Sequence, residues 1–358
     1  MLRSPAPCQV GAANGSRHPV PCGMPAPEHA TDDVTERASE HANQHANQHA
    51  NQHDPVHAAA ASVLGDAAAA QVTTLAGRSR GTLATVLTHA SVRRFTPDVI
   101  PDDVVQALRA ALVRGPTSSA LHSYSHVLVR DTERKRRLAH FAGDQPWIDQ
   151  APLLIVGCAD LRRAREATHA RGYRYTAHDV RMLISATADL TVGLQNASLV
   201  AQSLGYGTVL LGGVLNGSLE IAQALRLPER VVPLVGLSVG RPQGDRWPAP
   251  RPRLPLPLLL HDETWSLDEA AEMALLADYD ERTRVRGDFE GRRIAWSAMG
   301  RGGEDPIPEG AYGWLEHTAR KQGRATWGPQ GTKVDTDLGA QGLMVRSTGD
   351  ADGPPTES

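Results

Sequence analysis

Residues 178–213 read HDVRMLISATADLTVGLQNASLVAQSLGYGTVLLGG, and this stretch decides how the remaining chain can fold. From about His178 to Leu204 the apolar residues have helical spacing, and in the second half they surround the helix on nearly every side. A helix that is apolar all round is buried, so we expect a long central helix here. The run GYGTVLLGG that follows is typical of a buried strand bounded by glycine.

Further helices and strands alternate on both sides of this central stretch. The continuous apolar run PLLIVGCAD, 152–160, indicates a strand buried on both faces, whereas YSHVLVRD, 124–131, alternates like a half-buried strand. Another buried strand is expected within 227–240, and helices are expected over 82–90, 101–113, 132–142 and 267–284. Because the elements intermix without a regular βαβ rhythm, an α+β fold with a mixed, mostly antiparallel sheet flanked by helices fits better than a doubly wound fold.

The two ends of the chain differ in composition from this middle part. Residues 1–78 are rich in Ala, His, Asn, Gln and Pro and hold almost no large apolar residues, so burial cannot offset the entropy of ordering them. We expect a disordered extension there, a folded domain over 79–327 and a disordered tail over 328–358. A repeat, HANQHANQHANQH, could gather its histidines on one helix face and bind a divalent metal, but the composition favours a low-complexity tail. Those histidines are His41, His45, His49 and His53.

Charge and composition exclude several classes of partner. The formal net charge of −3 gives no electrostatic reason to expect nucleic acid or an anionic membrane surface. No apolar run approaches the ~20 residues that a membrane helix needs. The spacing of the three cysteines suggests neither a metal site nor a disulfide framework, so we expect a reducing, cytoplasmic setting and no metal.

Several polar or glycine-bearing segments stand at the ends of the expected elements. They are HASVRRF at 89–95, the loop hydroxyls of Thr117–Ser119, the pair Gly212-Gly213 after a buried strand, and Arg251 and Arg253 among prolines. Fixed cations and hydroxyls suit a phosphate, and bare glycine backbone suits the close approach of a flat ring. If that ring were a flavin, one edge of it would gain negative charge on reduction, and a cation would suit that edge. Taken singly, the arginine pair could equally be a solvated face and the other segments ordinary turns.

The order and wording of these segments resemble the nitroreductase family, in its subgroup of NADPH-dependent oxygen-insensitive nitroreductases and flavin reductases. The family phrase H-R-S-I-R-x-F corresponds to 89–95, and G-L-G-G-V-Y-I-G-G-L-R-N corresponds to GYGTVLLGGVLN at 205–216. L-P-L-F-G-L-C-L-G-x-P corresponds to VPLVGLSVGRP at 232–242, and K-P-R-L-P to RPRLP at 251–255. Later phrases match, in the same order, at 279–281, 286–287, 292–297 and 320–326.

The resemblance implies a nitroreductase-like fold, assembled as an intertwined homodimer with the long central helix and FMN at the interface. It assigns FMN binding to His89, Ser91, Arg93, Ser119, Gln145, Gly212, Gly213, Arg251 and Arg253. It assigns NADPH binding to Arg286 and Arg292, with Arg293 as a further candidate. Arg93 and Arg253 would hold the flavin phosphate, and Arg251 would lie near the pyrimidine edge of the ring.

The sequence also departs from the family phrases. Ala90 stands where the family has arginine, Leu210 where it has tyrosine, and His122 where it has glutamine. The stretch between Tyr279 and Arg286 is shortened. These changes bear more on the substrate and on NADPH preference than on FMN.

The activity implied is an FMN-dependent, NAD(P)H-using reduction of nitroaromatic, quinone or flavin acceptors by a two-electron ping-pong mechanism. No catalytic side chain is expected, because the flavin carries the chemistry. Two alternatives stay open. One is an FMN-dependent dehydrogenase or oxidase that tailors a natural product, and the other is a non-catalytic protein that binds flavin or senses metal through the histidine repeat.

Overall fold

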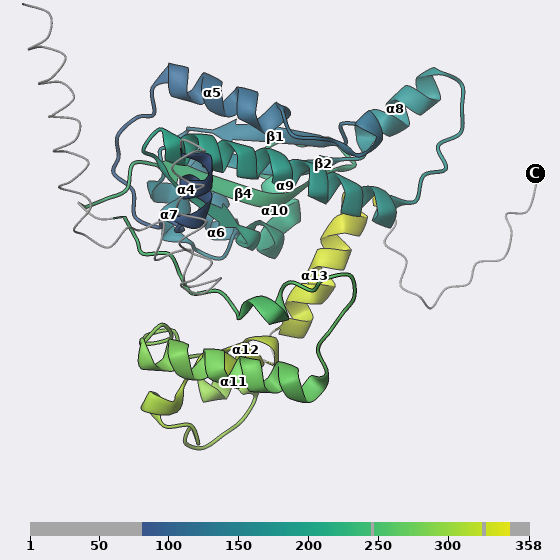
Figure 1. The fold of residues 1–358 in the computed structure, drawn as a ribbon. Helices are drawn as coiled ribbons and strands as arrows, with labels where there is room; N and C mark the ends of the chain where they lie inside the picture. Colours follow the sequence, from purple (N-terminus) through teal and green to yellow (C-terminus); the bar gives the residue numbers. More distant parts are fainter. Residues whose placement is uncertain (1–80, 245–246, 324–326, 344–358) are drawn as a thin grey trace, which may run out of the picture. The chain divides into compact units, whose positions relative to one another are not determined.

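The structure, a computed structural model, describes residues 81–244, 247–323 and 327–343 (Figure 1). The predicted N-terminal extension, with its histidine repeat, lies outside the described residues. The strands are β1 (Tyr124–Val129), β2 (Leu153–Asp160), β3 (Gly207–Leu211) and β4 (Val231–Gly240). The helices are α4 (Thr82–Leu87), α5 (Asp102–Val113), α6 (Thr132–Phe141), α7 (Pro146–Gln150), α8 (Arg162–Ala170), α9 (Asp179–Ser203), α10 (Ser218–Ala224), α11 (Glu269–Val285), α12 (Trp314–Gly323) and α13 (Trp327–Ala340).

The four strands form one sheet in the order β1-β2-β4-β3, and every neighbouring pair is antiparallel. All eight residues of β2 are buried, as its continuous apolar run predicts. Because successive side chains of a strand point to opposite faces, β2 contributes to two cores. Leu153 and Ile155 belong to the core that contains α5 and α9 residues, whereas Leu154 and Val156 belong to the core with α6 and α7 residues. The α+β prediction is therefore confirmed (Figure 1).

Helix α9 lies close to the sheet where β2 has a glycine. A Cβ atom added to Gly157 would come within 3.0 Å of the Leu194 side chain and 3.1 Å of the Leu190 side chain. On the helix itself, a Cβ at Gly193 would come within 2.5 Å of the Leu112 carbonyl of α5. The predicted long central helix is therefore confirmed, and glycines on both partners permit its close packing.

The prediction of a disordered tail over 328–358 is wrong for residues 328–343. Helix α13 occupies most of this range, and Leu338 and Leu343 are both buried in the same core as α9. Gly342, with φ +81°, ends the helix, and Leu343 N donates to the Leu338 carbonyl at 3.1 Å. This is a glycine-terminated helix end closed by a contact between two apolar residues.

Residue Arg230, in the turn before β4, ties the C-terminal segment to the rest of the fold. Its backbone N donates to the Gln341 carbonyl at 2.8 Å, and Nη1 donates to the Gly342 carbonyl at 2.6 Å. Its guanidinium also pairs with Asp179 at the start of α9, and both of these side chains are buried. Glycine, threonine and aspartate dominate the composition of α13, so the sequence alone does not indicate an apolar helical face there.

No helix among the described residues is long and apolar enough to cross a membrane.

Replacing Leu338 by alanine tests whether the C-terminal segment belongs to the core. Leu338→Ala should lower the free energy of unfolding by about 2–4 kcal/mol, the usual effect of a large-to-small change in a core. Urea unfolding followed by circular dichroism measures it. Asp335→Ala, on an exposed position of the same helix, should change the value by no more than about 0.5 kcal/mol. Equal effects for the two variants would show that α13 does not pack.

Candidate functional site

The segment that carries Ser91 and Arg93 runs along the edge of β3. Val92 N donates to the Thr208 carbonyl at 2.9 Å, and Val92 itself is buried. Phe95, further along, is buried and pairs with Pro242 in an isolated bridge. Because side chains alternate along extended backbone, an inward Val92 leaves Ser91 and Arg93 on the other side, away from the core.

Helix α9 positions His89. The imidazole Nδ1 lies 3.0 Å from Oε1 of Gln202, and the Gln202 amide nitrogen in turn donates to Ser198 Oγ at 2.9 Å. With Nδ1 occupied in this way, Nε2 of His89 is the ring nitrogen left for another partner.

Five of the residues predicted to bind FMN line one small hollow of about 130 Å³, which we call the Arg93 hollow. Its lining residues are His89, Ala90, Ser91, Arg93, Pro248, Ala249, Arg251 and Arg253. Partial burial and the nearby charge of Arg251 lower the pKa of Arg93. Within the described chain no carboxylate lies at ion-pair distance from these three arginines. Like charges held together without a counter-charge attract an anion, and a phosphate fits this donor set.

Gln145 and the two predicted glycines form a second part of the site. A Cβ on Gly213 would come within 2.1 Å of the Gln145 amide nitrogen and 2.5 Å of the Ala142 carbonyl, so only glycine fits there. A Cβ on Gly212 would meet nothing within 4 Å, which leaves its backbone bare toward open space. Trp147 connects this part to the Arg93 hollow, because the Arg93 guanidinium lies 5.8 Å from the centre of its ring.

Ser119 is not brought into the Arg93 hollow. It lines a different cavity of about 390 Å³, together with Arg181 and Asp189 of α9. Ser118 anchors this loop, because its backbone N donates to the buried Asp189 carboxylate at 3.0 Å. Ser119, Ala120 and His122 all have φ near +50°, a conformation that non-glycine residues adopt only when their surroundings hold them there.

Of the arginines predicted to bind NADPH, Arg292 lines a cavity, whereas Arg286 and Arg293 pair with carboxylates. Arg292 lines a cavity of about 400 Å³, the Arg292 cavity, which the proline-rich 251–253 segment also lines. Its lining residues are Arg251, Pro252, Arg253, Tyr279, Thr283, Asp288, Phe289, Arg292, Trp314, His317, Thr318, Lys321 and Gln322. Arg286 does not line it and pairs with Asp288 at 3.3 Å. Arg293 pairs with Asp305 and lies over the Tyr312 ring, a structural role.

The arm 269–323 is assembled around Arg320, which sequence reasoning did not single out. Its side chain is buried, donates to both Asp305 oxygens and to Glu316, and lies over the Trp296 ring. Hydrogen bonds from Arg320 and Arg293 hold the pKa of the Asp305 carboxyl well below its usual range. The only sequence signal for Arg320 is its place in the match at 320–326.

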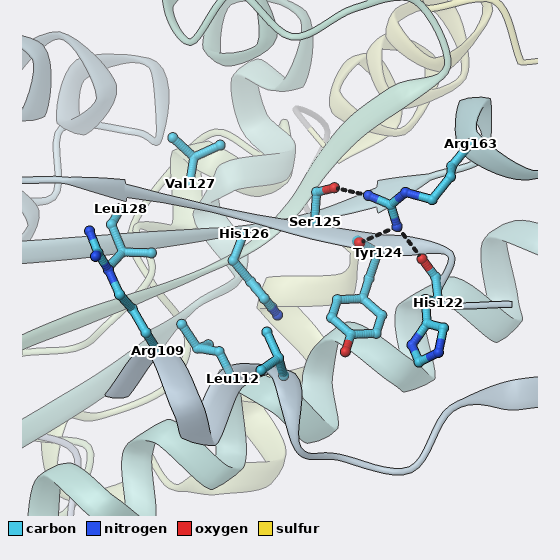
Figure 2. A pocket seen from close by; sticks show the side chains of 10 residues that line it. Arg109, Leu112, His122, Tyr124, Ser125, His126, Val127, Leu128 and Arg163 are labelled. Atoms are coloured by element: carbon cyan, nitrogen blue, oxygen red, sulfur yellow. Dashed lines mark hydrogen bonds between the residues drawn. The ribbon is translucent and has the colours of Figure 1, made fainter. Parts of the chain in front are cut away.

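A larger cavity, of about 800 Å³, lies between α5 and β1 and contains none of the predicted site residues (Figure 2). Arg163 donates to the carbonyls of His122 and Tyr124 and to Ser125 Oγ, so its guanidinium is occupied by the edge of β1 (Figure 2). His126 lies deep in this cavity. Burial lowers its pKa to about 4, against a smaller opposing effect of the Leu112 carbonyl. The imidazole is therefore neutral at neutral pH.

Known proteins of similar sequence identify the family of this chain. A model of the Nitroreductase family matches residues 86–241. The FMN reductase (NADPH) of Bacillus subtilis (strain 168) is 30% identical over 224 residues, which are 60% of this chain and 88% of the relative. The NADPH-flavin oxidoreductase of Vibrio harveyi is 32% identical over 208 residues, 56% of this chain and 84% of the relative.

Solved structures of known proteins also share the fold of this chain. The hypothetical oxidoreductase YcnD from Bacillus subtilis superposes with a TM-score of 0.64 at 27% identity, covering 74% of this chain and 99% of that one. The NADPH:FMN oxidoreductase from Vibrio harveyi complexed with NAD+ gives a TM-score of 0.59 at 26% identity, covering 74% and 100%. The fold and the matches define an oxidoreductase. The chain belongs to the nitroreductase family, which confirms the resemblance seen in its motifs.

The two neighbouring glycines give opposite expectations for the same substitution. Gly213→Ala should lower the free energy of unfolding by about 1–3 kcal/mol, because the added methyl group overpacks against Gln145 and Ala142. Gly212→Ala should lower it by less than about 1 kcal/mol, because its methyl group meets nothing. Thermal unfolding of both variants measures the difference, and a Gly212 variant as unstable as the Gly213 variant would contradict the geometry.

Burial of His126 predicts a pH dependence of stability. The pKa is near 6.5 in the unfolded chain and about 4 in the folded chain, so the unfolded state takes up the proton first as the pH falls. The contribution of His126 to the free energy of unfolding is fully present above pH 6.5. It decreases, by about 3 kcal/mol in all, as the pH falls to 4. Urea unfolding at pH 7 and pH 5 should show a smaller difference in His126→Gln than in the parent. His169→Gln, on an exposed position, should retain the parental difference.

Proposed function

We propose that this chain is an FMN-dependent, NAD(P)H-using oxidoreductase that reduces nitroaromatic, quinone or flavin acceptors by a two-electron ping-pong mechanism. The observation that carries the proposal is the Arg93 hollow, where three arginines, His89 and Ser91 meet without a carboxylate among the described residues. The relatives named FMN reductase (NADPH) and NADPH-flavin oxidoreductase support the same cofactors.

The residues around the hollow fit an FMN molecule in two ways. The arginines and Ser91 offer charged and hydroxyl donors for its phosphate. The bare backbone of Gly212 offers a flat surface, and Gly213 keeps Gln145 in place beside it. FMN, when bound, supplies the two-electron chemistry. The protein's part is to orient the ring, to hold the phosphate and to admit substrates.

NADPH is proposed to bind in the Arg292 cavity. This cavity shares Arg251 and Arg253 with the Arg93 hollow, so the two sites are neighbours. A 2′-phosphate is a dianion, for which arginine is a suitable partner, and Arg292 has no carboxylate at ion-pair distance in the described chain.

A homodimer is proposed as the active form. Ser119 is among the residues that the family assigns to FMN, yet in this chain it lines a cavity beside α9. A second copy could bring its Ser119 to the first copy's Arg93 hollow. The exposed apolar side chain of Ile184, 67% accessible on α9, supports burial of this helix against another copy.

Loss of one arginine from the hollow should weaken flavin binding. Arg93→Gln should raise the Kd for FMN by about 10- to 100-fold, because a charge-assisted hydrogen bond contributes about 1.5–3 kcal/mol. Fluorescence quenching of FMN titrated with the flavin-free protein measures it. Arg94→Gln removes the same charge from the next residue, which does not line the hollow, and should leave the Kd unchanged.

Anaerobic rapid mixing with NADPH tests the activity itself. The bound flavin should lose its visible absorbance on reduction and regain it when a quinone or nitroaromatic is added. A protein that holds FMN but is bleached by neither NADPH nor NADH would exclude the proposed reductase. A protein that does not take up added FMN would exclude the flavin assignment.

A further inference from the structure

The cations of the arm divide into those that have a carboxylate partner and those that do not. Arg282, Arg284 and Arg286 pair with Asp278, Glu281 and Asp288, and Arg293 and Arg320 both pair with Asp305. Arg292, Arg301 and Lys321 have no such partner among the described residues. Arg301 lies over the Trp296 ring, whereas Arg292 and Lys321 line the Arg292 cavity.

Lys321 is placed there by the helix that carries it. Arg320, the preceding residue of α12, turns inward and is fixed by Glu316 and Asp305. Lys321 is exposed and lines the cavity from the last turn of the helix, as does Gln322, and His317 lines it from the first turn. Arg320 therefore stabilises the arm, and Lys321 presents its charge to the cavity.

The remaining walls suit a nucleoside. Trp314 and Tyr279 meet edge to face with ring centres 5.6 Å apart, and Phe289 lies 5.1 Å from the His317 ring. Burial and the charge of Lys321 lower the pKa of His317, so its imidazole is neutral at neutral pH. The cavity thus combines aromatic surface with cations, as the binding of an adenosine phosphate requires.

Asp288 is the one carboxylate among the described residues that line the cavity, and Arg286 partly neutralises it. An unpaired carboxylate would repel a phosphate, so Arg286 favours anion binding through Asp288 and not by direct contact. The family resemblance assigns Arg286 to NADPH. The geometry makes Lys321 the better second cation, because it faces the cavity and has no competing partner within the described residues.

We propose that Lys321, with Arg292, binds the 2′-phosphate of NADPH and so sets the preference of this chain for NADPH over NADH. This rests on the proposed function, in that NADPH is taken as the electron donor. The chemical class that the site recognises is a 2′-phosphorylated adenosine, and the two side chains act on binding, not on the transfer of electrons.

Calorimetric titration of the FMN-loaded protein with 2′,5′-ADP and with 5′-AMP tests the proposal without any turnover. The parent should bind 2′,5′-ADP more tightly than 5′-AMP. Lys321→Gln should reduce that preference about 10-fold, since one charge-assisted contact to phosphate is lost, and Lys321→Arg should retain most of it. Arg282→Gln, which removes one charge from α11 outside the cavity, should leave it unchanged.

Steady-state kinetics provide a second readout. Lys321→Gln should raise the KM for NADPH about 10-fold, with kcat and the KM for NADH unchanged. Equal losses with the two donors, no loss at all, or a larger loss of 2′,5′-ADP preference in Arg286→Gln than in Lys321→Gln would each overturn the assignment.

The two proposals fail in distinguishable ways. If the flavin is reduced equally well by NADPH and NADH and the parent does not prefer 2′,5′-ADP, the proposed function survives and the role of Lys321 is excluded. If neither donor reduces the flavin while the 2′,5′-ADP preference depends on Lys321, the binding site stands and the reductase proposal is excluded.

Discussion

The close packing of α9 on the sheet is the constraint on which the rest of the fold depends. Glycine at position 157 of β2 and glycine at position 193 of α9 remove the side chains that would hold the helix away from β2 and α5. Larger residues at either place would separate the layers, and a core this dense cannot absorb such a change without strain. The long helix is thus a fixed reference for the loops that end beside it.

Two of those loops carry residues of the candidate site. Gln202 near the end of α9 holds His89, and Asp189 near the middle of the helix holds the backbone and hydroxyl of Ser118. One rigid helix therefore positions both the segment beside the Arg93 hollow and the strained loop of Ser119. A cofactor site made from distant parts of a sequence needs such a common support, because small displacements of its polar groups weaken binding strongly.

The sequence predicted those features whose cause is local. Patterns in the sequence show the apolar run of β2, the long α9, the glycine pair and the arginines in extended segments, and the family resemblance added Gln145. Helix α13 could not be predicted from composition, because glycine, threonine and aspartate dominate it and because its end is held by Arg230, which is distant in the sequence. The roles of Arg286 and Lys321 depend on which carboxylate each one meets, and that is decided by tertiary contacts.

The segment that bears Arg251 and Arg253 is a wall shared by the Arg93 hollow and the Arg292 cavity. Pro252 between the two arginines, whose carbonyl accepts from the Tyr279 hydroxyl at 3.3 Å, limits how far this wall can shift. The same two charges consequently act on an anion in either place. Thermodynamic linkage then couples the occupants: an anion in one hollow screens the charge available to the other, and the coupling is equal in both directions. Added salt weakens both sites and their mutual influence together, because the arginines concerned are exposed to solvent.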